Sequence, residues 1–459
     1  MARVTVTMLT LLALAAALAG QSPKAAPNGA VLYEGARLIP GDGTPAIENA
    51  AFIVDGGTIT RVGRQGDVTR AGAARVNLAG KTVMPALINA HGHPGFQKGL
   101  TYARENYTRE TYIDDLNRAA YYGVGAVLAQ GIDPGDLPFQ IRAEQQAGTL
   151  GGARLFTAGR GIGAPNAGPG AEAYRGIAYE VTTPDEGRKS VREMVAKKVD
   201  VVKIWVDDRN GRAPRMPAPV FRAIIDEAHS HGIRVNAHVF YLTDARDLVD
   251  AGVDGFAHLV RDRDMDDALI SAIVRKNVYV MPNLGGAERT THAAQPPWLA
   301  SWLAGPLLLQ DTVPANVIQR MRDTRREPAD AEASRARYAI LQRSLAKLNA
   351  AGARIVLGSD TGLPDHFFGF AEQRELQLMV DAGMTPAQVI VAATSRPAEY
   401  LRLKNLGTLA PGKAADFLVL DANPLEDIAN TRRISKVYLR GQEIDRPAMR
   451  ARWASGATN

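Results

Sequence analysis

The chain contains no cysteine in its 459 residues. This absence excludes disulfide bonds, thiolate ligands for a metal, a lipid-modified cysteine and a cysteine nucleophile. A protein of this sequence must therefore gain its stability from packing and, where one is bound, from a metal ion.

A long apolar run is also lacking. The most apolar segment, Val4 to Ala16, is shorter than a membrane-spanning helix requires. It follows Arg3 and precedes the small residues Ala17-Leu18-Ala19, which is the order of parts in an export signal. We predict a signal peptide over residues 1–20 and an exported mature protein, periplasmic or secreted, with no stable membrane insertion. A buried N-terminal helix is the alternative.

Blocks of basic residues are lacking as well. The 54 Lys and Arg residues are interspersed with 48 Asp and Glu residues, for a formal net charge of +6. The segment densest in charge, RDTRREPADAEASRAR, contains both signs, as a solvated helix face does. No basic patch with interleaved aromatic residues is present in the sequence, so we expect no nucleic-acid partner.

The composition is that of a large folded protein, with 46% hydrophobic and 22% charged residues. β-Rich runs such as VLYEGARLI follow the linker QSPKAAPNGA, and Asp55-Gly56-Gly57 predicts a hairpin turn between two of them. The same pattern returns near the end in ADFLVLD and SKVYLRGQEI. We predict one small β-sandwich domain built from residues 28–84 and 405–445, with a separate C-terminal β-domain as the alternative.

Residues 85–404 show a different pattern, in which helical segments end at Gly or Asn and run into short apolar strands. Gly232, Gly252, Asn277 and Gly352 suit the left-handed position just after a helix. Repeated helix and strand units predict parallel strands with helical crossovers, and their number favours a closed (β/α)8 TIM barrel of the α/β class. An open doubly wound sheet is the alternative.

Reactive side chains cluster at the ends of these strands. His91 and His93 are alternate residues of one strand in VMPALINAHGH, so both can face one ion. The later strands carry Lys203 in VVKIW, His238 in RVNAH, His258 in GFAH and Asp360 in RIVLGSD. Because barrel enzymes build their sites at the carboxyl ends of the strands, we expect these side chains to meet at one rim.

These motifs resemble the amidohydrolase superfamily, in its imidazolonepropionase-like and Xaa-Pro dipeptidase-like branches. The resemblance covers nearly all of the mature chain, including the ending GTLAPGKAADFLVLDANPLEDI, where the chain returns to the β-domain. It implies a metal-dependent barrel joined to a small β-sandwich.

The resemblance also implies roles for individual residues. His91, His93 and Asp360 would bind a first metal, and His238 and His258 would bind a second. Lys203 aligns with a lysine that captures carbon dioxide, and the resulting carbamate bridges the two divalent ions, for which zinc is the first expectation. A metal-bridging hydroxide would attack the substrate, and Asp360 would accept its proton and deliver it to the leaving nitrogen.

One departure from the family pattern concerns the segment before the histidine pair. Family members often have Pro-Gly-Leu-Ile-Asp there, whereas this chain has Pro85, Ala86, Leu87, Ile88 and Asn89. We expect Asn89 to weaken metal binding, because it lacks a carboxylate that could orient a ligand histidine.

Three further residues are candidates for contact with a substrate. Tyr241 could donate to the carbonyl oxygen, Arg261 could bind a substrate carboxylate, and Asn283 faces the same rim. For Arg261, a structural salt bridge to Asp262, Asp264 or another neighbour is the alternative that we favour.

Outside this set, His229 and His231 are expected to cap a helix at the surface. His292 and His366 lie in loops that could cover the site. The segment 286–335, with Trp298 and Trp302, predicts a lid or substrate wall, and a contact in a homo-oligomer is the alternative.

Three functions remain open from the sequence. The favoured one is hydrolysis of a C–N amide bond in small peptides, as by a dipeptidase, or in N-acyl amino acids. A mononuclear hydrolase that opens a cyclic amide, similar to imidazolonepropionase, is the second. The third is a barrel that binds a ligand without catalysis, although all six expected ligand positions are occupied.

Overall fold

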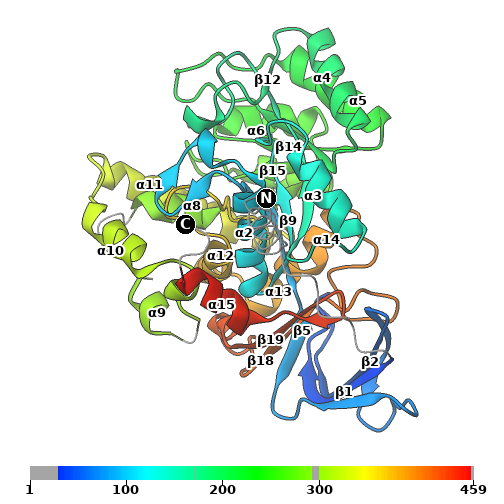
Figure 1. Ribbon diagram of the computed structural model, residues 1–459. Coiled ribbons are helices and arrows are strands. Elements are labelled where there is room, and N and C mark those ends of the chain that lie inside the picture. The colour runs from blue at the N-terminus through cyan, green and yellow to red at the C-terminus, as the bar shows by residue number, and fades with distance from the viewer. Residues whose placement is uncertain (1–28, 171, 292–298, 306, 456–459) are drawn as a thin grey trace, which may run out of the picture.

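Strands from the two ends of the chain meet in one sheet. The computed structural model describes residues 29–170, 172–291, 299–305 and 307–455, so the predicted signal peptide, His292 and Trp298 lie outside the described residues. The sheet has eight strands in the order β20-β19-β18-β5-β1-β2-β3, and β4 also pairs with β1. Figure 1 shows its early strands, in blue, beside its late strands, in orange and red. The strand bounds are β1 Val31–Leu38, β2 Ile47–Asp55, β3 Thr58–Arg64, β4 Ala74–Asn77, β5 Thr82–Pro85, β18 Phe417–Leu420, β19 Ile434–Leu439 and β20 Gln442–Glu443.

Local sequence explains how this sheet turns and packs. Asp55 pairs with Thr58, and the two residues between them, Gly56 and Gly57, have positive φ angles of 55° and 78°, as the predicted hairpin turn requires. Aromatic residues of the sheet pack on each other, and the ring of Tyr33 stacks on that of Phe52 with 4.9 Å between the ring centres. The strands β1 to β5 and β18 to β20, which come from the two ends of the chain, form a single sheet, so the predicted β-sandwich stays a prediction.

Eight parallel strands follow one another through the middle of the chain. They are β6 Leu87–Gly92, β9 Val124–Ala129, β10 Arg154–Thr157, β13 Val201–Trp205, β14 Arg234–His238, β15 Gly255–Ala257, β16 Tyr279–Met281 and β17 Arg354–Ile355. Two further short parallel strands, β11 Ile162–Gly163 and β12 Tyr179–Glu180, join them. The ten strands form a three-stranded sheet, β10-β9-β6, and a seven-stranded sheet, β12-β11-β13-β14-β15-β16-β17. The short hairpin of β7 Gln97–Lys98 and β8 Thr101–Tyr102 stands apart from both.

Backbone hydrogen bonds connect the two sheets at both edges of the smaller one. At one edge, the N–H of Asp200, just before β13, donates to the carbonyl of Thr157 in β10 at 2.9 Å. At the other edge, the N–H of Ala90 in β6 donates to the carbonyl of Leu357, just beyond β17, also at 2.9 Å. The carboxyl ends of β6 and β17 therefore lie side by side.

Helices connect these strands and cover them, as Figure 1 shows. Their bounds are α2 Arg109–Tyr121, α3 Leu137–Gln146, α4 Pro184–Ala196, α5 Ala218–Ser230, α6 Leu242–Asp250, α7 Asp267–Arg275, α8 Leu284–Thr291, α9 Leu299–Ala304, α10 Ala315–Thr324, α11 Ala331–Ala350, α12 Phe370–Asp381, α13 Pro386–Ala393, α14 Ser395–Tyr400 and α15 Arg446–Ala454. Short 3-10 helices occur at Arg104–Asn106, Glu172–Tyr174, Leu309–Asp311 and Ile428–Arg432. Among the described residues, no helix is both long enough and apolar enough to cross a membrane.

The helix ends follow the signals in the sequence. Thr183 caps α4, where its side chain accepts from the N–H of Glu186 and the Glu186 side chain accepts in return. The four residues predicted to follow a helix, Gly232, Gly252, Asn277 and Gly352, all have positive φ angles. This part of the prediction is confirmed, and it explains why each helix stops where the next strand must begin.

Trp302 of α9 packs in the core and does not form the predicted substrate wall. Its side chain is 2% exposed, its ring meets Phe370 edge to face at 4.7 Å, and the Arg432 guanidinium lies 3.8 Å from its ring centre. Arg432 belongs to the segment between β18 and β19. At this residue the insertion therefore packs against the connection between β18 and β19 of the eight-stranded sheet.

Candidate metal centre

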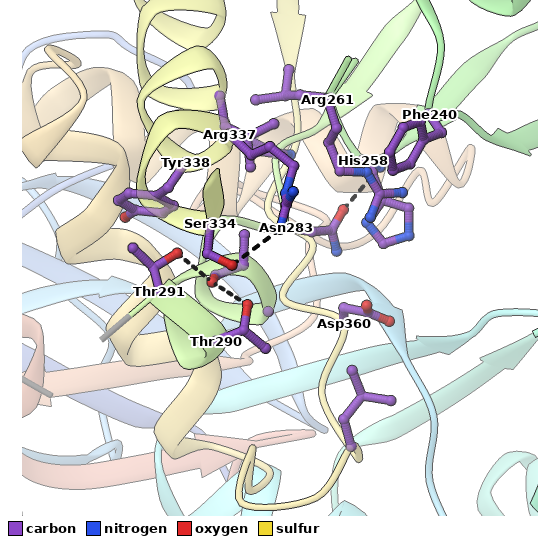
Figure 2. A pocket seen from close by; sticks show the side chains of 16 residues that line it. Phe240, His258, Arg261, Asn283, Thr290, Thr291, Ser334, Arg337, Tyr338 and Asp360 are labelled. Carbon is purple, nitrogen blue, oxygen red and sulfur yellow. Dashed lines mark hydrogen bonds between the residues drawn. The ribbon is translucent and has the colours of Figure 1, made fainter. Parts of the chain in front are cut away.

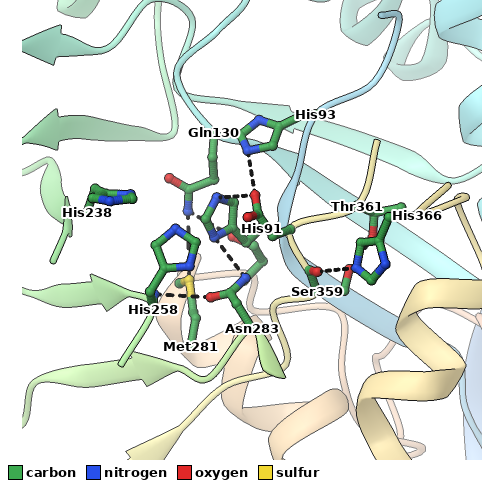
Figure 3. Close-up of polar contacts among 12 residues, drawn as sticks. His91, His93, Gln130, His238, His258, Met281, Asn283, Ser359, Thr361 and His366 are labelled. Carbon is green, nitrogen blue, oxygen red and sulfur yellow. Dashed lines mark hydrogen bonds and ion pairs between the residues drawn. The ribbon is translucent and has the colours of Figure 1, made fainter. Parts of the chain in front are cut away.

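Two histidines lie on the same side of β6, because alternate side chains of a strand point in the same direction. His91 lies in the strand and His93 directly follows it, and both are almost completely buried. Their ring centres are 5.0 Å apart, and Figure 3 shows the two side chains next to each other. The pair thus presents imidazole nitrogens to one point, as the sequence predicts.

Asp360 approaches this pair from the segment that follows β17. Its Oδ1 lies 2.9 Å from Nε2 of His93 and 3.4 Å from Nε2 of His91. The Asp360 N–H donates to the carbonyl of His91, which fixes the backbone of the two segments to each other. Asp360 itself has a φ of 57°, a left-handed conformation that aspartate tolerates better than most residues.

The other two histidines come from neighbouring strands. His238 ends β14 and His258 follows β15, and their rings are 4.6 Å apart, which confirms that they are neighbours in space. His258 is also 5.1 Å from His91, measured between ring centres. One potential ligand atom from each of His91, His258 and Asp360 lies within 4.8 Å of the other two, so these three residues could hold one metal ion.

Lys203 of β13 is buried beside this group without a hydrogen bond or counter-ion, and its Nζ lies 5.7 Å from the ring centre of Trp205. It is 1% exposed, and its Nζ makes no hydrogen bond or ion pair with any described residue, including Asp207 and Asp208. Its side chain fits against Gly131, where an added Cβ would lie 2.7 Å from Cγ of Lys203. Burial lowers the pKa of Lys203 to about 7, so a large part of the population carries a neutral amine near neutral pH.

Burial sets the charge state of the histidines, and the histidines set that of Asp360. Desolvation lowers the pKa of His91, His238 and His258 well below the usual value, so these rings are neutral near neutral pH. Burial alone would raise the pKa of Asp360, but His91, His93 and His258 outweigh it and hold that pKa well below its ordinary value. The site therefore combines neutral imidazoles with an ionised carboxylate, the forms that bind metals.

Buried polar atoms without partners support the presence of a bound ion. Besides Nζ of Lys203, Nδ1 of His93 and Oδ1 of Asp207 are buried and make no hydrogen bond to the described residues. The Oδ1 of Asp207 faces Nε2 of His238 at 3.5 Å. Such atoms are costly to bury unless a ligand satisfies them, and a divalent cation fits this set of nitrogen and oxygen donors.

The three predicted substrate residues have different surroundings. The Tyr241 hydroxyl donates to Asp208 at 2.9 Å, so its predicted role as donor to a substrate carbonyl has no support in its position. The Asn283 side chain lies behind the histidines, where its amide donates to Nδ1 of His91 and its carbonyl oxygen accepts from the N–H of His258, each at 3.1 Å. It positions these residues, and it also lines the cavity beside the site.

Arg261 does not form the salt bridge that we favoured. Asp262 pairs with Arg263 and Asp264 pairs with Arg343, while Arg261 donates to Nε2 of His238 at 3.1 Å. Burial among charged neighbours lowers its pKa to about 10, which still leaves it cationic at neutral pH. Arg261 therefore adds a positive charge at the edge of the histidine cluster.

Asn89 acts differently from our expectation. Its carbonyl oxygen accepts from the N–H of His91 at 2.9 Å and of Ser359 at 3.3 Å, and its amide donates to Glu372 at 2.6 Å. Asn89 therefore holds the two backbone segments that carry His91 and Asp360, and it contacts no histidine ring. An amide suits this place because a buried carboxylate, Glu372, faces it.

The remaining histidines lie outside the cluster. His229 pairs with Asp254 at 2.7 Å and His231 with Glu227 at 3.3 Å, both near the surface end of α5, as expected. His366 is 3% exposed, and its Nε2 lies 2.8 Å from the carbonyl oxygen of Ser359. It supports the segment that leads to Asp360.

Other polar residues near the cluster are missed by the sequence analysis. Gln130, directly after β9, is fully buried, and its Oε1 has no partner among the described residues. Its place at the carboxyl end of a parallel strand is a signal that could have found it. The hydroxyls of Tyr102 and Tyr174 are likewise buried without described partners, and the Tyr174 ring lies 6.1 Å from that of His93. No motif in the sequence marks these tyrosines.

Comparison with known proteins identifies the class to which this fold and site belong. A sequence model of the Amidohydrolase family matches residues 82–444, so the chain belongs to the amidohydrolase family. A solved Xaa-Pro dipeptidase with methionine bound in its active site is similar over 90% of this chain and 99% of its own, with a TM-score of 0.72 and 22% identity. This likeness establishes an α/β fold of the TIM-barrel type.

Curated relatives match smaller parts of the chain. An uncharacterized protein of Mycobacterium bovis is 26% identical over 216 residues, which cover 46% of this chain and 52% of that protein. The chain thus matches about half the length of this relative. The imidazolonepropionase of Deinococcus deserti is 38% identical over 92 residues, 20% of this chain and 23% of the enzyme. The predicted family is confirmed.

Proposed function

We propose that this protein hydrolyses an amide bond in small peptides or N-acyl amino acids with two divalent cations. The observation that carries the proposal is the buried, unpartnered amine of Lys203 beside four histidines and Asp360. A lysine buried without a counter-ion is unfavourable, so a chemical reason for its position is needed. Carbamate formation supplies one.

The proposed modification converts Lys203 into a metal ligand. The neutral amine attacks carbon dioxide, a C–N bond forms, and one proton is released to solvent, which leaves a carbamate anion. Modified in this way, Lys203 would help to hold the two cations as an anionic ligand. His91, His93 and Asp360 would hold one ion, and His238 and His258 would hold the other, with zinc as the first expectation for this donor set.

The closed (β/α)8 barrel is part of the proposal, because it brings all six ligands to one rim. It is supported by the backbone bonds from Asp200 to Thr157 and from Ala90 to Leu357, which connect both edges of the small parallel sheet to the larger one. We propose a barrel over residues 85–404 and a β-sandwich over 28–84 and 405–445.

The chemistry divides between the ions and the chain. Bound divalent cations would supply Lewis acidity, which lowers the pKa of water and polarises a carbonyl. Asp360, ionised and in contact with His93, would accept the proton of the attacking water. It would then deliver that proton to the leaving nitrogen. His366 and Asn89 would hold the backbone of the Asp360 segment in place during this transfer.

Metal content tests the binuclear centre. We would purify the full chain without chelators and in bicarbonate, and measure metal per chain for the native protein, Lys203→Ala and the exposed control Lys189→Ala. The proposal expects about two metals in the native protein and the control, and one or none in Lys203→Ala. Equal metal content in all three proteins would refute the carbamate bridge.

Asp360→Asn tests the proton transfer. Asparagine keeps the shape of the side chain and one ligand oxygen but cannot act as a base. We expect most of the metal to be retained and the turnover of dipeptides and N-acyl amino acids to fall by about a hundredfold to ten-thousandfold. Full activity in this variant would exclude Asp360 as the base.

Two alternatives have distinct outcomes in the same measurements. The local likeness to imidazolonepropionase favours a mononuclear hydrolase that opens a cyclic amide. One metal in both the native protein and Lys203→Ala, with turnover of cyclic amides, would support it. No metal in either protein and no turnover would favour a barrel that binds a ligand without catalysis.

We also propose that the protein is exported, since residues 1–20 have the composition of a signal peptide. Intact mass of the protein recovered from a bacterial host that exports it tests this. A mature chain that begins near residue 20, found outside the cytoplasm, is expected. A homo-oligomer is a further possibility that light scattering on the purified protein would decide.

A further inference from the structure

A cavity of about 310 Å³ opens beside the candidate metal centre. It reaches from His258 and Asp360 to the helices α8 and α11 (Figure 2). In the close-up, His258, Arg261 and Phe240 lie on one side of the cavity, and Arg337 and Tyr338 of α11 lie on the other. The cavity is therefore in contact with the reacting centre at one end and with the predicted insertion at the other.

The charges around this cavity favour an anion. Its ionisable lining residues, apart from Tyr338, are the neutral His258, the ionised Asp360, and Arg261 and Arg337. His258 and Asp360 belong to the proposed metal ligands, which leaves two arginines and no further carboxylate in the lining. A substrate group that enters the cavity would therefore meet positive charge.

The two arginines differ in what they already bind. Arg337 pairs with Asp330 at 2.7 Å and donates to Ser334 at 3.1 Å. Arg261 has no carboxylate within ion-pair distance in the described part of the chain, and its buried Nε makes no hydrogen bond there. The Nη2 atom of Arg261 donates to Nε2 of His238 and to the carbonyl oxygen of Val239, each at 3.1 Å. Arg261 is the arginine with hydrogen-bonding capacity to spare.

The rest of the cavity wall is largely apolar. Phe240, Leu259, Leu341 and Leu363 line it, and the Phe240 ring lies 5.1 Å from the Arg261 guanidinium. An apolar wall next to a buried cation matches an amino acid that has a carboxylate on one side of its α-carbon and an apolar side chain on the other.

We propose that this cavity binds the leaving half of the substrate, an amino acid whose free carboxylate pairs with Arg261 and whose apolar side chain packs against Phe240 and Leu341. This inference rests on the proposed amide hydrolysis and names its substrate class: dipeptides and N-acyl amino acids with an apolar C-terminal residue. The distance from the proposed metal ligands to Arg261 suits such a substrate. Its carboxylate carbon is only two bonds from the amide nitrogen, and Arg261 is hydrogen-bonded to the proposed ligand His238. Internal peptide bonds and C-terminal amides lack the anion and are poor substrates.

Binding of the product half tests the cavity without turnover. We would measure the affinity of the full chain for leucine, leucinol and glycine by isothermal titration, because leucinol lacks the carboxylate and glycine lacks the side chain. Loss of one partner of a buried charge pair implies that leucine binds at least about thirtyfold more tightly than leucinol. Glycine is expected to bind at least about tenfold more weakly than leucine.

Two variants assign the effect to one arginine. In Arg261→Gln the leucine-to-leucinol ratio is expected to fall close to one, while Arg343→Gln keeps the native ratio, because Arg343 is an exposed arginine of α11 that pairs with Asp264 and lies outside the cavity lining. A ratio near one in the native protein, or a native ratio in folded Arg261→Gln, would overturn the inference. If Arg261→Gln does not fold, the native ratio still decides, and Arg261→Lys replaces it with an expected intermediate value.

The outcome separates this inference from the proposed function. Two metals per chain and turnover of amides, without a preference for leucine, would remove the Arg261 subsite and leave the binuclear hydrolase. A preference for leucine that depends on Arg261, in a protein whose metal content is unaffected by Lys203→Ala, would leave the subsite and remove the carbamate centre.

Discussion

Replacement of Asn89 by aspartate tests how the candidate site is held together. The Asn89 amide nitrogen lies 2.6 Å from Oε1 of Glu372, which also accepts from the Thr361 hydroxyl at 2.8 Å. Both Asn89 and Glu372 are fully buried. Asn89→Asp keeps the shape of the side chain but turns this hydrogen bond into a contact between two carboxylates.

Two estimates give the size of the effect. Repulsion between two unit charges at this separation is about 6 kcal/mol at an effective dielectric constant of about 20. Protonation of one carboxyl avoids it and costs about 3.7 kcal/mol at pH 7, given an unfolded pKa of about 4.3. Protonation is the cheaper route, so we expect Asn89→Asp to lower the free energy of unfolding by about 3 to 4 kcal/mol at pH 7.

The loss should depend on pH in a defined direction. Burial already raises the pKa of Glu372, and the added carboxylate raises the pKa of the pair further. The folded variant then binds more protons than the unfolded one, so its stability falls as pH rises above the unfolded pKa. The deficit should shrink to about 1 kcal/mol at pH 5.

Urea unfolding of the metal-free protein at these two pH values is the assay, with the exposed Asn77→Asp as a control for the added charge. In the double variant Asn89→Asp, Glu372→Gln, an amide again faces a carboxylate, and most of the stability should return at both pH values. A single variant as stable as the native protein at pH 7, or a double variant no more stable than the single, would refute the reasoning.

Three further outcomes are expected. Trp302→Ala should lower the free energy of unfolding in urea by about 3 to 5 kcal/mol and leave KM for a dipeptide unchanged, whereas a rise in KM alone would restore the substrate-wall interpretation. Gly131→Ala should reduce metal content per chain, because its new Cβ meets the Lys203 side chain and its φ is 82°; native metal content would contradict this. Thr183→Ala should cost about 1 kcal/mol through loss of the α4 cap, and no change in the urea midpoint would show that the cap contributes nothing.

The parts of the fold that depend on local sequence are those that sequence analysis predicts well. The left-handed residues after helices, the turn at Gly56 and Gly57 and the alternation that aligns His91 with His93 are each set within a few residues. Their physical causes, backbone freedom of glycine and the period of a strand, are visible without a structure.

The errors concern contacts between residues far apart in the chain. Asn89 was judged by its own missing carboxylate, although Glu372, 283 residues away, explains why an amide is needed. Arg261 was expected to pair with an acidic neighbour in sequence, but those acids have other partners. Trp302 was assigned to a lid because the segment around it is richer in Pro, Trp and charge than a plain connection requires, whereas the packing of Phe370 and Arg432 around it could not be foreseen.

The contact of Asp360 with His93 also has a consequence for how the chain folds. These two residues are 267 positions apart, and the strands that carry them are the last and the first of the parallel series. Closing a loop of this length costs entropy before any favourable contact is made, so the site should form late in folding. A fragment that ends before residue 360 lacks one of the proposed ligands. Recovery of metal affinity during refolding should therefore lag behind recovery of helix content, and it would report completion of the whole domain.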